Sequence, residues 1–154
     1  MIRFIQISTN EQYAAAAKLF EEYSEWLGID LCFQGFSEEL NDLRHMYGLP
    51  NGGIILCEID NQFVGCVAVR RIDDNGAELK RMYVQPQQQQ KGIGSALLDH
   101  ALLLARECGY KKIQLDTLST MTPAMNLYLK NGFVEIPPYY HNPIETAVYF
   151  EKLL

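Results

Sequence analysis

The segment "YVQPQQQQKGIGSALLDHALLLARECGY" does most to limit the folds open to this chain. Before it, the run "AELKRMYV" has the composition of a strand and ends at Val84. An apolar stripe at helical spacing then begins at Ile93 and stops at Gly109. After Gly109, "KKIQLDTL" alternates as a strand. A strand, a helix and a strand within about 40 residues predict a βαβ unit with parallel strands.

The remaining segments predict further helices and an antiparallel meander. Ser8 or Thr9 caps a predicted helix that ends at Gly28, and a second helix begins at the cap Ser37 and ends at Gly48. We therefore expect a single domain over residues 1–154, with the element order α-α-β-β-β-α-β-α-β-β. The other predicted elements are strands at 53–59, 62–72, 77–84 and 146–154 and a helix at 123–131, capped by Thr122.

Composition and charge exclude several classes of function. Lys and Arg number 13 against 19 Asp and Glu, a formal charge of -6, so no basic surface is expected for nucleic acid or anionic membranes. No segment approaches the roughly 20 apolar residues of a membrane span, and the start lacks the layout of a signal peptide. We expect a cytoplasmic protein. The 4 cysteines form no C-x-x-C pair and the 3 histidines are scattered, so we expect reduced thiols and no metal.

The Gly-x-Gly turn before the long helix is a candidate anion site. The first turn of a helix leaves main-chain N–H groups without partners at the positive end of the dipole. Gly92 and Gly94 let a pyrophosphate approach the amides from about Gln90 to Ser95, with Lys91 adding charge. The spacing fits neither a P-loop nor a dinucleotide fingerprint, because the latter needs a third small residue where "GIGSAL" has leucine.

These residues carry a family resemblance. The segment "MYVQPQQQQKGIGSALL" resembles the Q/R-x-x-G-x-G/A signature of the GNAT superfamily of acyl-CoA-dependent N-acyltransferases, with Gln89, Gly92 and Gly94 at its defining positions. The resemblance continues through "IQLDT" and "AMNLYLKNGF" and covers about residues 54–136. It implies a fold of α/β (α+β) class, in which about four helices flank a mixed, mostly antiparallel twisted sheet with a central, splayed parallel strand pair.

The same resemblance implies acetyl-CoA as the co-substrate. Its pyrophosphate would lie on the helix entrance, and its pantetheine arm would lie between the splayed strands as a pseudo-strand. Gln89 stands where Arg is also common in the family, so we expect main-chain donors to contribute most of the affinity. The implied cofactor-binding residues are Met82, Val84, Gln89, Gln90, Lys91, Gly92, Ile93, Gly94, Ser95 and Tyr128.

Acyl transfer to an amine needs a proton acceptor, since an alkylamine with a pKa near 10.4 is about a thousandth neutral at pH 7. Strand alternation predicts Glu78, Lys80, Met82 and Val84 on one side of their strand. The resemblance implies that Glu78 stands where the histone-modifying branch carries its general base. Two alternatives remain open: ordered water as the base, and a carboxylate neutralised by Lys80 or Arg71.

The departing thiolate needs a proton or a strong hydrogen bond, and Tyr128 stands where GNAT enzymes commonly carry the tyrosine that supplies it. Simple packing of Tyr128 is the alternative. Met121 departs from the family pattern, which often has Asn there, so a side-chain contact to the cofactor is missing. Backbone N–H groups near Val84 would stabilise the oxyanion. Without a Ser, His and Asp constellation, direct attack by the amine in a ternary complex is expected.

The acceptor would be bound by aromatic residues from two regions. The segment "EIPPYYHNP" offers aromatic faces and polar tips, and a core edge or a homodimer contact is the alternative role for its tyrosines. The expected function is acetyl transfer from acetyl-CoA to a primary amine of a small molecule or protein. The alternative is a non-catalytic coenzyme A sensor of the same fold. Candidate acceptor-binding residues are Trp26, Phe33, Phe36, Tyr139, Tyr140 and His141.

Overall fold

A computed structural model describes the backbone of residues 1–154 and every side chain except that of Phe33. Seven strands form one sheet in the order β1-β2-β3-β4-β5-β7-β6. The strands are β1 (Ile2–Gln6), β2 (Gly53–Ile59), β3 (Gln62–Arg71), β4 (Gly76–Val84), β5 (Lys112–Leu118), β6 (Val134–Ile136) and β7 (Ala147–Leu153). The helices are α1 (Asn10–Leu27), α2 (Phe36–Leu40), α3 (Leu43–Met46), α4 (Ile93–Glu107) and α5 (Thr122–Lys130), with short 3-10 turns at Cys32–Gln34 and Pro86–Gln88.

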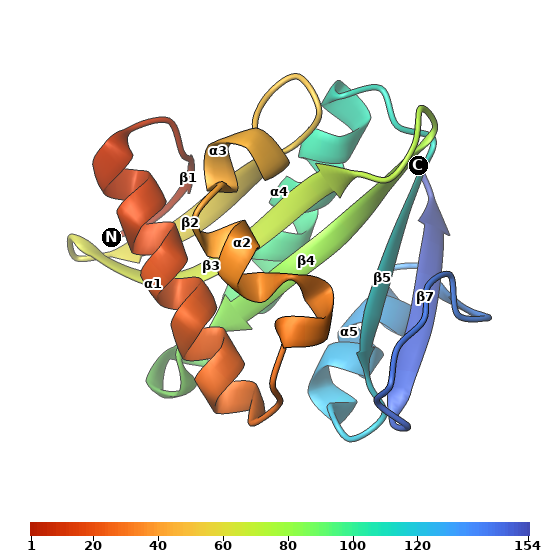
Figure 1. Cartoon of the computed structure of the whole chain (residues 1–154). Coiled ribbons are helices and arrows are strands. Elements are labelled where there is room, and N and C mark those ends of the chain that lie inside the picture. The colour runs from red at the N-terminus through yellow and green to blue at the C-terminus, as the bar shows by residue number, and fades with distance from the viewer.

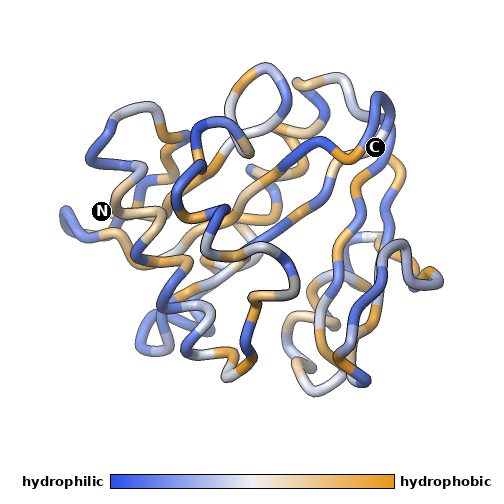
Figure 2. Tube along the Cα trace, in the orientation of Figure 1, coloured by the Kyte–Doolittle hydropathy of each residue, from blue (hydrophilic) through white to orange (hydrophobic). Residues whose placement is uncertain are grey.

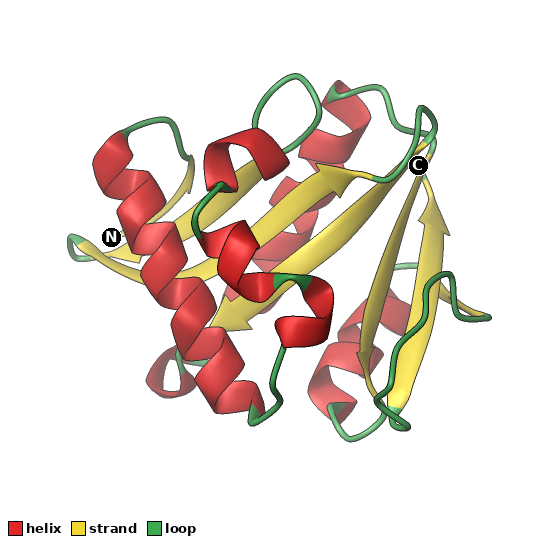
Figure 3. Ribbon diagram, viewed as in Figure 1, coloured by secondary structure: helices red, strands yellow, loops and turns green.

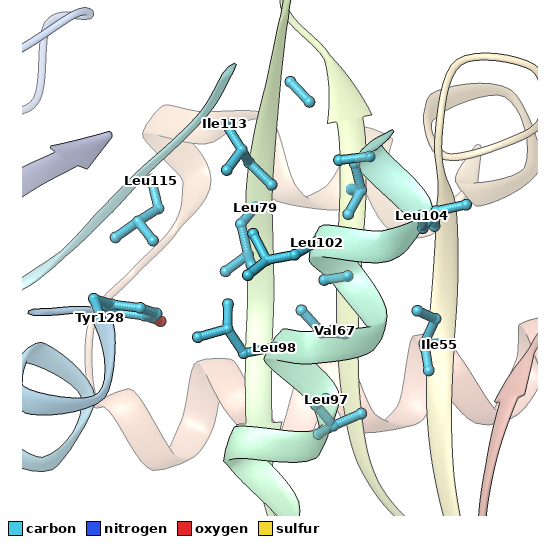
Figure 4. Packing of buried hydrophobic residues seen from close by; sticks show 14 of the residues in the cluster. Ile55, Val67, Leu79, Leu97, Leu98, Leu102, Leu104, Ile113, Leu115 and Tyr128 are labelled. Atoms are coloured by element: carbon cyan, nitrogen blue, oxygen red, sulfur yellow. The ribbon is translucent and has the colours of Figure 1, made fainter. Parts of the chain in front are cut away.

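The sheet lies between two layers of helices. Helices α1, α2 and α3 cover what we call the front face, and α4 and α5 cover the back face (Figures 1 and 3). Each face has its own apolar core: α1 contributes Leu19 and Phe20 to the front core, and α4 contributes Leu97 and Leu98 to the back core. Figure 4 shows Leu98 and Leu102 of α4 against Leu79 of β4. Apolar burial of this kind is the main driving force for the fold.

Local sequence explains the bounds of the longer helices. Thr9 caps α1 with a capping box, in which its hydroxyl accepts from the Gln12 amide and the Gln12 side chain accepts from the Thr9 amide. Gly28 ends α1 in the left-handed conformation, with a φ of 72°.

The hydropathy of the chain follows the sheet. In Figure 2 the β2–β3 turn is hydrophilic, while apolar positions recur along the central strands.

The predicted class and most of the predicted elements are confirmed. The sheet is mixed and mostly antiparallel, and its one parallel pair joins β4 to β5 through α4, as the βαβ prediction requires. The predicted helix from Ser37 to Gly48 is wrong as one element, because it breaks into α2 and α3 at Asn41 and Asp42. The Asn41 side chain donates to the Ser37 carbonyl, a local bond that competes with helix continuation.

Two further details differ from the sequence prediction. Strand β1 was not predicted; it is a short edge strand that pairs antiparallel with β2, from Ile2 opposite Ile59 onward. Its stability depends on that distant pairing, which a local pattern does not reveal. The N-cap of α5 is Met121, without a side-chain cap, and Thr122 is already the first helical residue.

Strands β4 and β5 separate after a short paired stretch. They pair in parallel only from Gly76 opposite Lys112 to Glu78 opposite Gln114. Beyond this point β5 stays paired with β7 as far as Leu118 opposite Ala147, and Figure 1 shows the carboxyl ends of β4 and β5 moving apart. The splayed pair expected from the sequence is therefore present.

A β-bulge interrupts β4, so its side chains do not alternate between the two faces of the sheet as predicted. The β3–β4 register shifts between Cys66 and Ala68, and Arg81 has a φ of 57°. One extra residue on β4 reverses the side on which later side chains point. Glu78 and Lys80 precede the bulge and both lie on the front face. Met82 follows it and packs in the back core. Val84 also packs on the back core, so the prediction that all four residues share one side is wrong.

Candidate functional site

A slit lies between the separating ends of β4 and β5. Its free volume is about 70 Å³, room for a few water molecules. Residues from α1 on the front and from α5 on the back both border it, so the slit crosses the sheet. The lining residues are Tyr23, Leu27, Leu31, Gln34, Leu79, Lys80, Arg81, Met82, Asp116, Thr117, Leu118, Met121, Ala124, Tyr128 and Ile144.

A buried ion pair holds the bulge that forms one wall of the slit. Arg81 donates from Nε to Glu39 Oε2 over 2.9 Å and from Nη2 to Glu39 Oε1 over 2.7 Å. The Tyr47 hydroxyl also donates to Glu39 Oε2, over 2.9 Å. A left-handed conformation is costly for a residue with a side chain. The bidentate pair holds Arg81 in it, because rotation of the backbone would break both bonds.

A chain of hydrogen bonds continues from Arg81 across the slit to β5. Arg81 Nη1 donates to Gln34 Oε1 over 2.8 Å, and Gln34 Nε2 donates to the Tyr140 hydroxyl over 3.1 Å. Tyr140 in turn donates to Asp116 Oδ2 over 2.8 Å. Asn142 Nδ2 donates to the Tyr140 hydroxyl over 3.1 Å. The network fixes the position of a carboxylate at the edge of the slit.

The Asp116 carboxylate is poised to accept a proton. Burial raises its pKa, although the hydrogen bond from Tyr140 opposes that shift, and the Glu78 charge adds to the increase. Within the described side chains, no cation forms an ion pair with Asp116. A carboxylate whose pKa is raised toward the working pH is a better proton acceptor than an ordinary exposed one.

Three donors reach the slit without a hydrogen-bond partner among the described residues. They are the hydroxyls of Tyr23 and Tyr128 and the ammonium group of Lys80. Every fully enclosed side-chain nitrogen or oxygen of the described residues has a partner, so these three atoms must touch open space. Burial raises the pKa of Tyr23 to about 12 and raises that of Tyr128 further, so both hydroxyls stay protonated.

Glu78 is 2% exposed and already fully engaged. Arg70 Nε donates to its Oε1 over 2.8 Å, and the Tyr139 hydroxyl donates to its Oε2 over 2.7 Å. Arg70 therefore neutralises Glu78, whereas Arg71 pairs with Asp74 instead. Lys80 Nζ is farther from Glu78 Oε1, at 3.9 Å. Both carboxylate oxygens thus have donors in this structure.

Glu78 belongs to a second, outer pocket on the front face. Its free volume is about 250 Å³. Gln34 and Lys80 line both this pocket and the slit, so the two spaces meet at these side chains. The outer pocket is lined by Gln34, Arg70, Ile72, Glu78, Lys80, Tyr139 and Tyr140.

The entrance of α4 presents free main-chain donors. In the described chain, none of the amides of Gly92, Ile93, Gly94 and Ser95 donates a hydrogen bond, and the first helical bond runs from the Ala96 amide to the Gly92 carbonyl. Gln90 and Gly92 have φ values of 65° and 81°. This alternation of left-handed residues turns successive N–H groups toward one point and forms a nest for an anion.

The other predicted cofactor residues surround this entrance. Gln89 Nε2 donates to the Val84 carbonyl over 2.9 Å, so the side chain fastens the loop to β4. Lys91 Nζ donates to Gln88 Oε1 over 2.9 Å. Gln90 and Ser95 are exposed, whereas the Ile93 side chain is buried in the back core. The loop is therefore attached to β4 and exposed to solvent on its other side.

The predicted acceptor residues divide into two groups. Tyr139 and Tyr140 line the outer pocket. Trp26 is 44% exposed and packs on Tyr83 at 5.7 Å between ring centroids, outside both cavities, while Leu27 beside it lines the slit. His141 is exposed, and Phe36 packs beneath the Arg81 guanidinium, 5.2 Å from it to the ring centroid. The side chain of Phe33, the remaining candidate, is outside the described residues.

Sequence reasoning missed several polar residues of the site, among them Tyr23, Gln34, Arg70 and Asp116. Asp116 had a usable signal, since it is an acidic residue near the carboxyl end of a strand that runs parallel to its neighbour, where sites commonly form. Tyr23 and Gln34 had none, because an amphipathic helix and a loop provide many such residues. Arg70 is on β3, and its role depends on the cross-strand pairing with Glu78.

The structure gives no indication of a metal site or a membrane span in its described residues. No three His, Cys, Asp or Glu side chains among them gather in a way that could hold a metal ion. None of the described helices combines the length and apolar content needed to cross a membrane.

The chain resembles known proteins in both sequence and structure. Residues 13–133 match the family model described as the acetyltransferase (GNAT) family. An uncharacterized N-acetyltransferase from Schizosaccharomyces pombe is 38% identical over 133 residues, which are 85% of this chain and 82% of the relative. An acetyltransferase from Streptococcus agalactiae shares the fold with a TM-score of 0.82 at 22% identity, over 99% of this chain and 98% of the other. The PaiA N-acetyltransferase from Thermoplasma acidophilum, solved with coenzyme A, has a TM-score of 0.75 at 22% identity, over 100% of this chain and 99% of the other.

Proposed function

The chain belongs to the GNAT family of acetyltransferases, and on that basis we propose that it transfers an acetyl group from acetyl-CoA to a primary amine. The observation that carries the proposal is a slit between splayed β4 and β5, together with a helix entrance whose amides have no partner among the described residues. A relative of known fold, PaiA, was solved with coenzyme A. The acceptor is a small molecule or a protein, and the reaction proceeds by direct attack in a ternary complex.

The cofactor would be held at two places. The amides from Gly92 to Ser95 bind the pyrophosphate, because their N–H groups have no partner among the described residues and lie at the positive end of α4. The pantetheine arm runs along the edge of β4 that faces away from β3, where Met82 and Val84 offer main-chain groups beyond the last pairing with β5. The thioester then lies in the slit, beside Tyr128.

The acceptor amine must lose a proton before or during attack. We assign acceptance of that proton to Asp116, because it borders the slit, has no paired cation among the described residues and has a raised pKa. Glu78, the candidate from the sequence, has donors on both oxygens. Glu78 instead holds Arg70 and Tyr139 in position through these hydrogen bonds. If the amine does not contact Asp116 directly, an ordered water molecule carries the proton from the amine to the carboxylate.

The transfer forms one carbon–nitrogen bond and breaks one carbon–sulfur bond. The amine nitrogen attacks the thioester carbonyl carbon, the carbon–sulfur bond breaks, and the amine proton passes to Asp116. Main-chain N–H groups near Val84 stabilise the oxyanion. The Tyr128 hydroxyl, held protonated by burial, donates a hydrogen bond to the departing sulfur. The departing thiolate takes up a proton from solvent and Asp116 releases the amine proton to solvent, so coenzyme A leaves as the thiol and the acceptor leaves as an N-acetyl amide.

Turnover and cofactor binding together test this function. The protein is incubated with acetyl-CoA and a panel of primary amines, and release of free thiol and formation of the N-acetyl product are measured. Amine-dependent thiol release supports the enzyme. Tight calorimetric binding of coenzyme A without turnover on any amine would favour the alternative, a non-catalytic sensor of coenzyme A. Met121, in place of the Asn common in the family, is the feature that keeps this alternative open.

A further inference from the structure

Lys80 is a buried cation without a hydrogen-bond acceptor in the described chain. Its side chain is 9% exposed, and its Nζ is 3.9 Å from the nearest carboxylate oxygen, Glu78 Oε1. That distance is too long for a hydrogen bond. Burial lowers the pKa of Lys80, and the Glu78 charge opposes part of this shift. A buried ammonium in this position is costly unless another group supplies the missing negative charge.

The outer pocket holds one more positive charge than negative charge, and Asp116, whose carboxylate interacts with Lys80 from the slit, is the remaining carboxylate nearby. Arg81 is balanced by its own bidentate partner, Glu39. In the outer pocket two cations, Arg70 and Lys80, share a single carboxylate, Glu78. Tyr139 and Tyr140, which line this pocket, stay neutral, since burial and the nearby carboxylates raise the pKa of each hydroxyl. The pocket thus has the charge to receive one monoanion.

The same lysine also lies between the two cavities. Lys80 lines the outer pocket together with Arg70, and it lines the slit together with Asp116. A ligand in the outer pocket with an anionic group at Lys80 therefore has Asp116 within the adjoining space. The unmatched cation is at one end of this path, and the carboxylate without a paired cation is at the other.

We propose that the acceptor is a small primary amine that carries a carboxylate, such as an amino acid. Lys80, with Arg70 beside it, binds the acceptor carboxylate, and the amine points into the slit toward Asp116. This inference rests on the proposed acetyl transfer and names its substrate class. A carboxylate fits better than a phosphate, because a dianion would exceed the single unmatched charge and would approach Glu78.

Matched pairs of acceptors test the inference in the whole protein. Each amino acid in a panel is compared with its carboxamide, which keeps the amine and the side chain but lacks the negative charge. We expect kcat/KM to be at least about 10-fold higher for the acid, as typical for a charged hydrogen bond. In the Lys80→Met variant this preference should disappear, because kcat/KM for the acid should fall by about 10- to 100-fold while kcat/KM for the amide should not. Lys80→Arg should restore part of it.

The matched control is Lys112→Met, which removes a half-exposed lysine from the neighbouring strand, outside both cavities. It should keep the acid preference. The inference is wrong if wild-type protein uses acid and amide equally well, or if Lys80→Met retains the preference. Turnover confined to amines without a carboxylate would support acetyl transfer but exclude amino acids as the substrate class.

A binding measurement keeps the inference testable if turnover is absent. Amino acids and their amides are titrated calorimetrically into protein saturated with coenzyme A. Binding of the acid that Lys80→Met weakens, and that Lys112→Met does not, supports the carboxylate site. Equal binding of acid and amide overturns it. The result thereby separates a failure of this inference from a failure of the proposed reaction.

Discussion

At the scale of single residues, the chemistry of the slit depends on groups that the protein leaves unpaired. The Tyr128 hydroxyl has no partner among the described residues, although the ring packs closely on Phe133 and Phe150 at 5.5 and 6.2 Å between centroids. The ring therefore fixes the direction of a donor that remains available. Figure 4 shows Tyr128 at the edge of the back core, beside β5 and its Leu115.

Tyr128→Phe separates packing from chemistry at this position. The ring keeps its contacts, so we expect the fold and the affinity for coenzyme A to change little. Loss of the hydrogen bond to the departing sulfur should lower kcat by about 10- to 1000-fold. Steady-state kinetics with calorimetry of coenzyme A binding measures both effects. Unchanged turnover would remove Tyr128 from the mechanism.

Asp116→Asn tests the proton acceptor through its pH dependence. Because the carboxylate must be ionised to accept a proton, activity should rise with pH as Asp116 ionises. Burial raises the pKa of Asp116, so this rise should lie above the usual aspartate value near 3.9. The variant should lose about 100-fold or more in kcat/KM and lose the rise itself. The matched control is Glu78→Gln; a larger effect there than at Asp116 would return the role of base to Glu78.

At the scale of elements, the entrance of α4 combines unpaired amides with a left-handed Gly92. A side chain at Gly92 would meet no atom within 4 Å, but its φ of 81° disfavours any residue with a β-carbon. Gly109 at the far end of α4 has the same two properties, with a φ of 89°. A substitution at Gly109 is therefore a matched control for the backbone strain that a substitution at Gly92 introduces.

Gly92→Val should abolish or strongly weaken binding of coenzyme A. The strained loop can no longer present its amides to the pyrophosphate, and the new side chain occupies the space that the phosphates need. Gly109→Val should cause comparable thermal destabilisation with unchanged cofactor affinity. Melting temperature and calorimetry compare the two. Normal binding by Gly92→Val would show that the pyrophosphate lies elsewhere.

Sequence patterns predicted most of the elements and located the glycine turn before α4, because the causes of these features are local. Glycine spacing, helical periodicity and caps act over a few residues, so the entrance at Gly92 could be located from them. The bulge at Arg81 could not, since its left-handed conformation depends on Glu39, far away in the sequence. Asp116 could have been noted from its place near the end of a strand, but its raised pKa could not, because the segments that bury it meet only in the fold.

At the scale of the whole molecule, the Glu39–Arg81 pair connects the front helices to the central strand. Glu39 is on α2 and Arg81 is on β4, and both are buried. Burial by itself raises the pKa of Glu39, but the hydrogen bonds and charge of Arg81 outweigh it, so the pKa is lowered overall. A lowered folded-state pKa stabilises the protein above the unfolded value near 4.3, and this contribution is lost as pH falls through the folded value.

Glu39→Gln should destabilise the protein by about 3 kcal/mol at pH 7, since it leaves a buried guanidinium without its charge partner. The difference from wild type should shrink as pH falls below about 4.3, where Glu39 of the unfolded chain takes up a proton, and it should vanish below the lowered pKa of the folded state. Urea unfolding at pH 7 and pH 3 measures both values. Glu38→Gln, at the exposed neighbour, should change stability by less than about 0.5 kcal/mol. A pH-independent difference would contradict this account.

The extra residue in β4 also restricts how related sequences can differ in length. Insertion or deletion of one residue between Leu79 and Tyr83 would exchange the two faces of the strand end and turn Met82 out of the back core. Homologous chains should therefore vary in length at surface turns such as residues 72–75 and keep the spacing between Glu78 and Val84 constant.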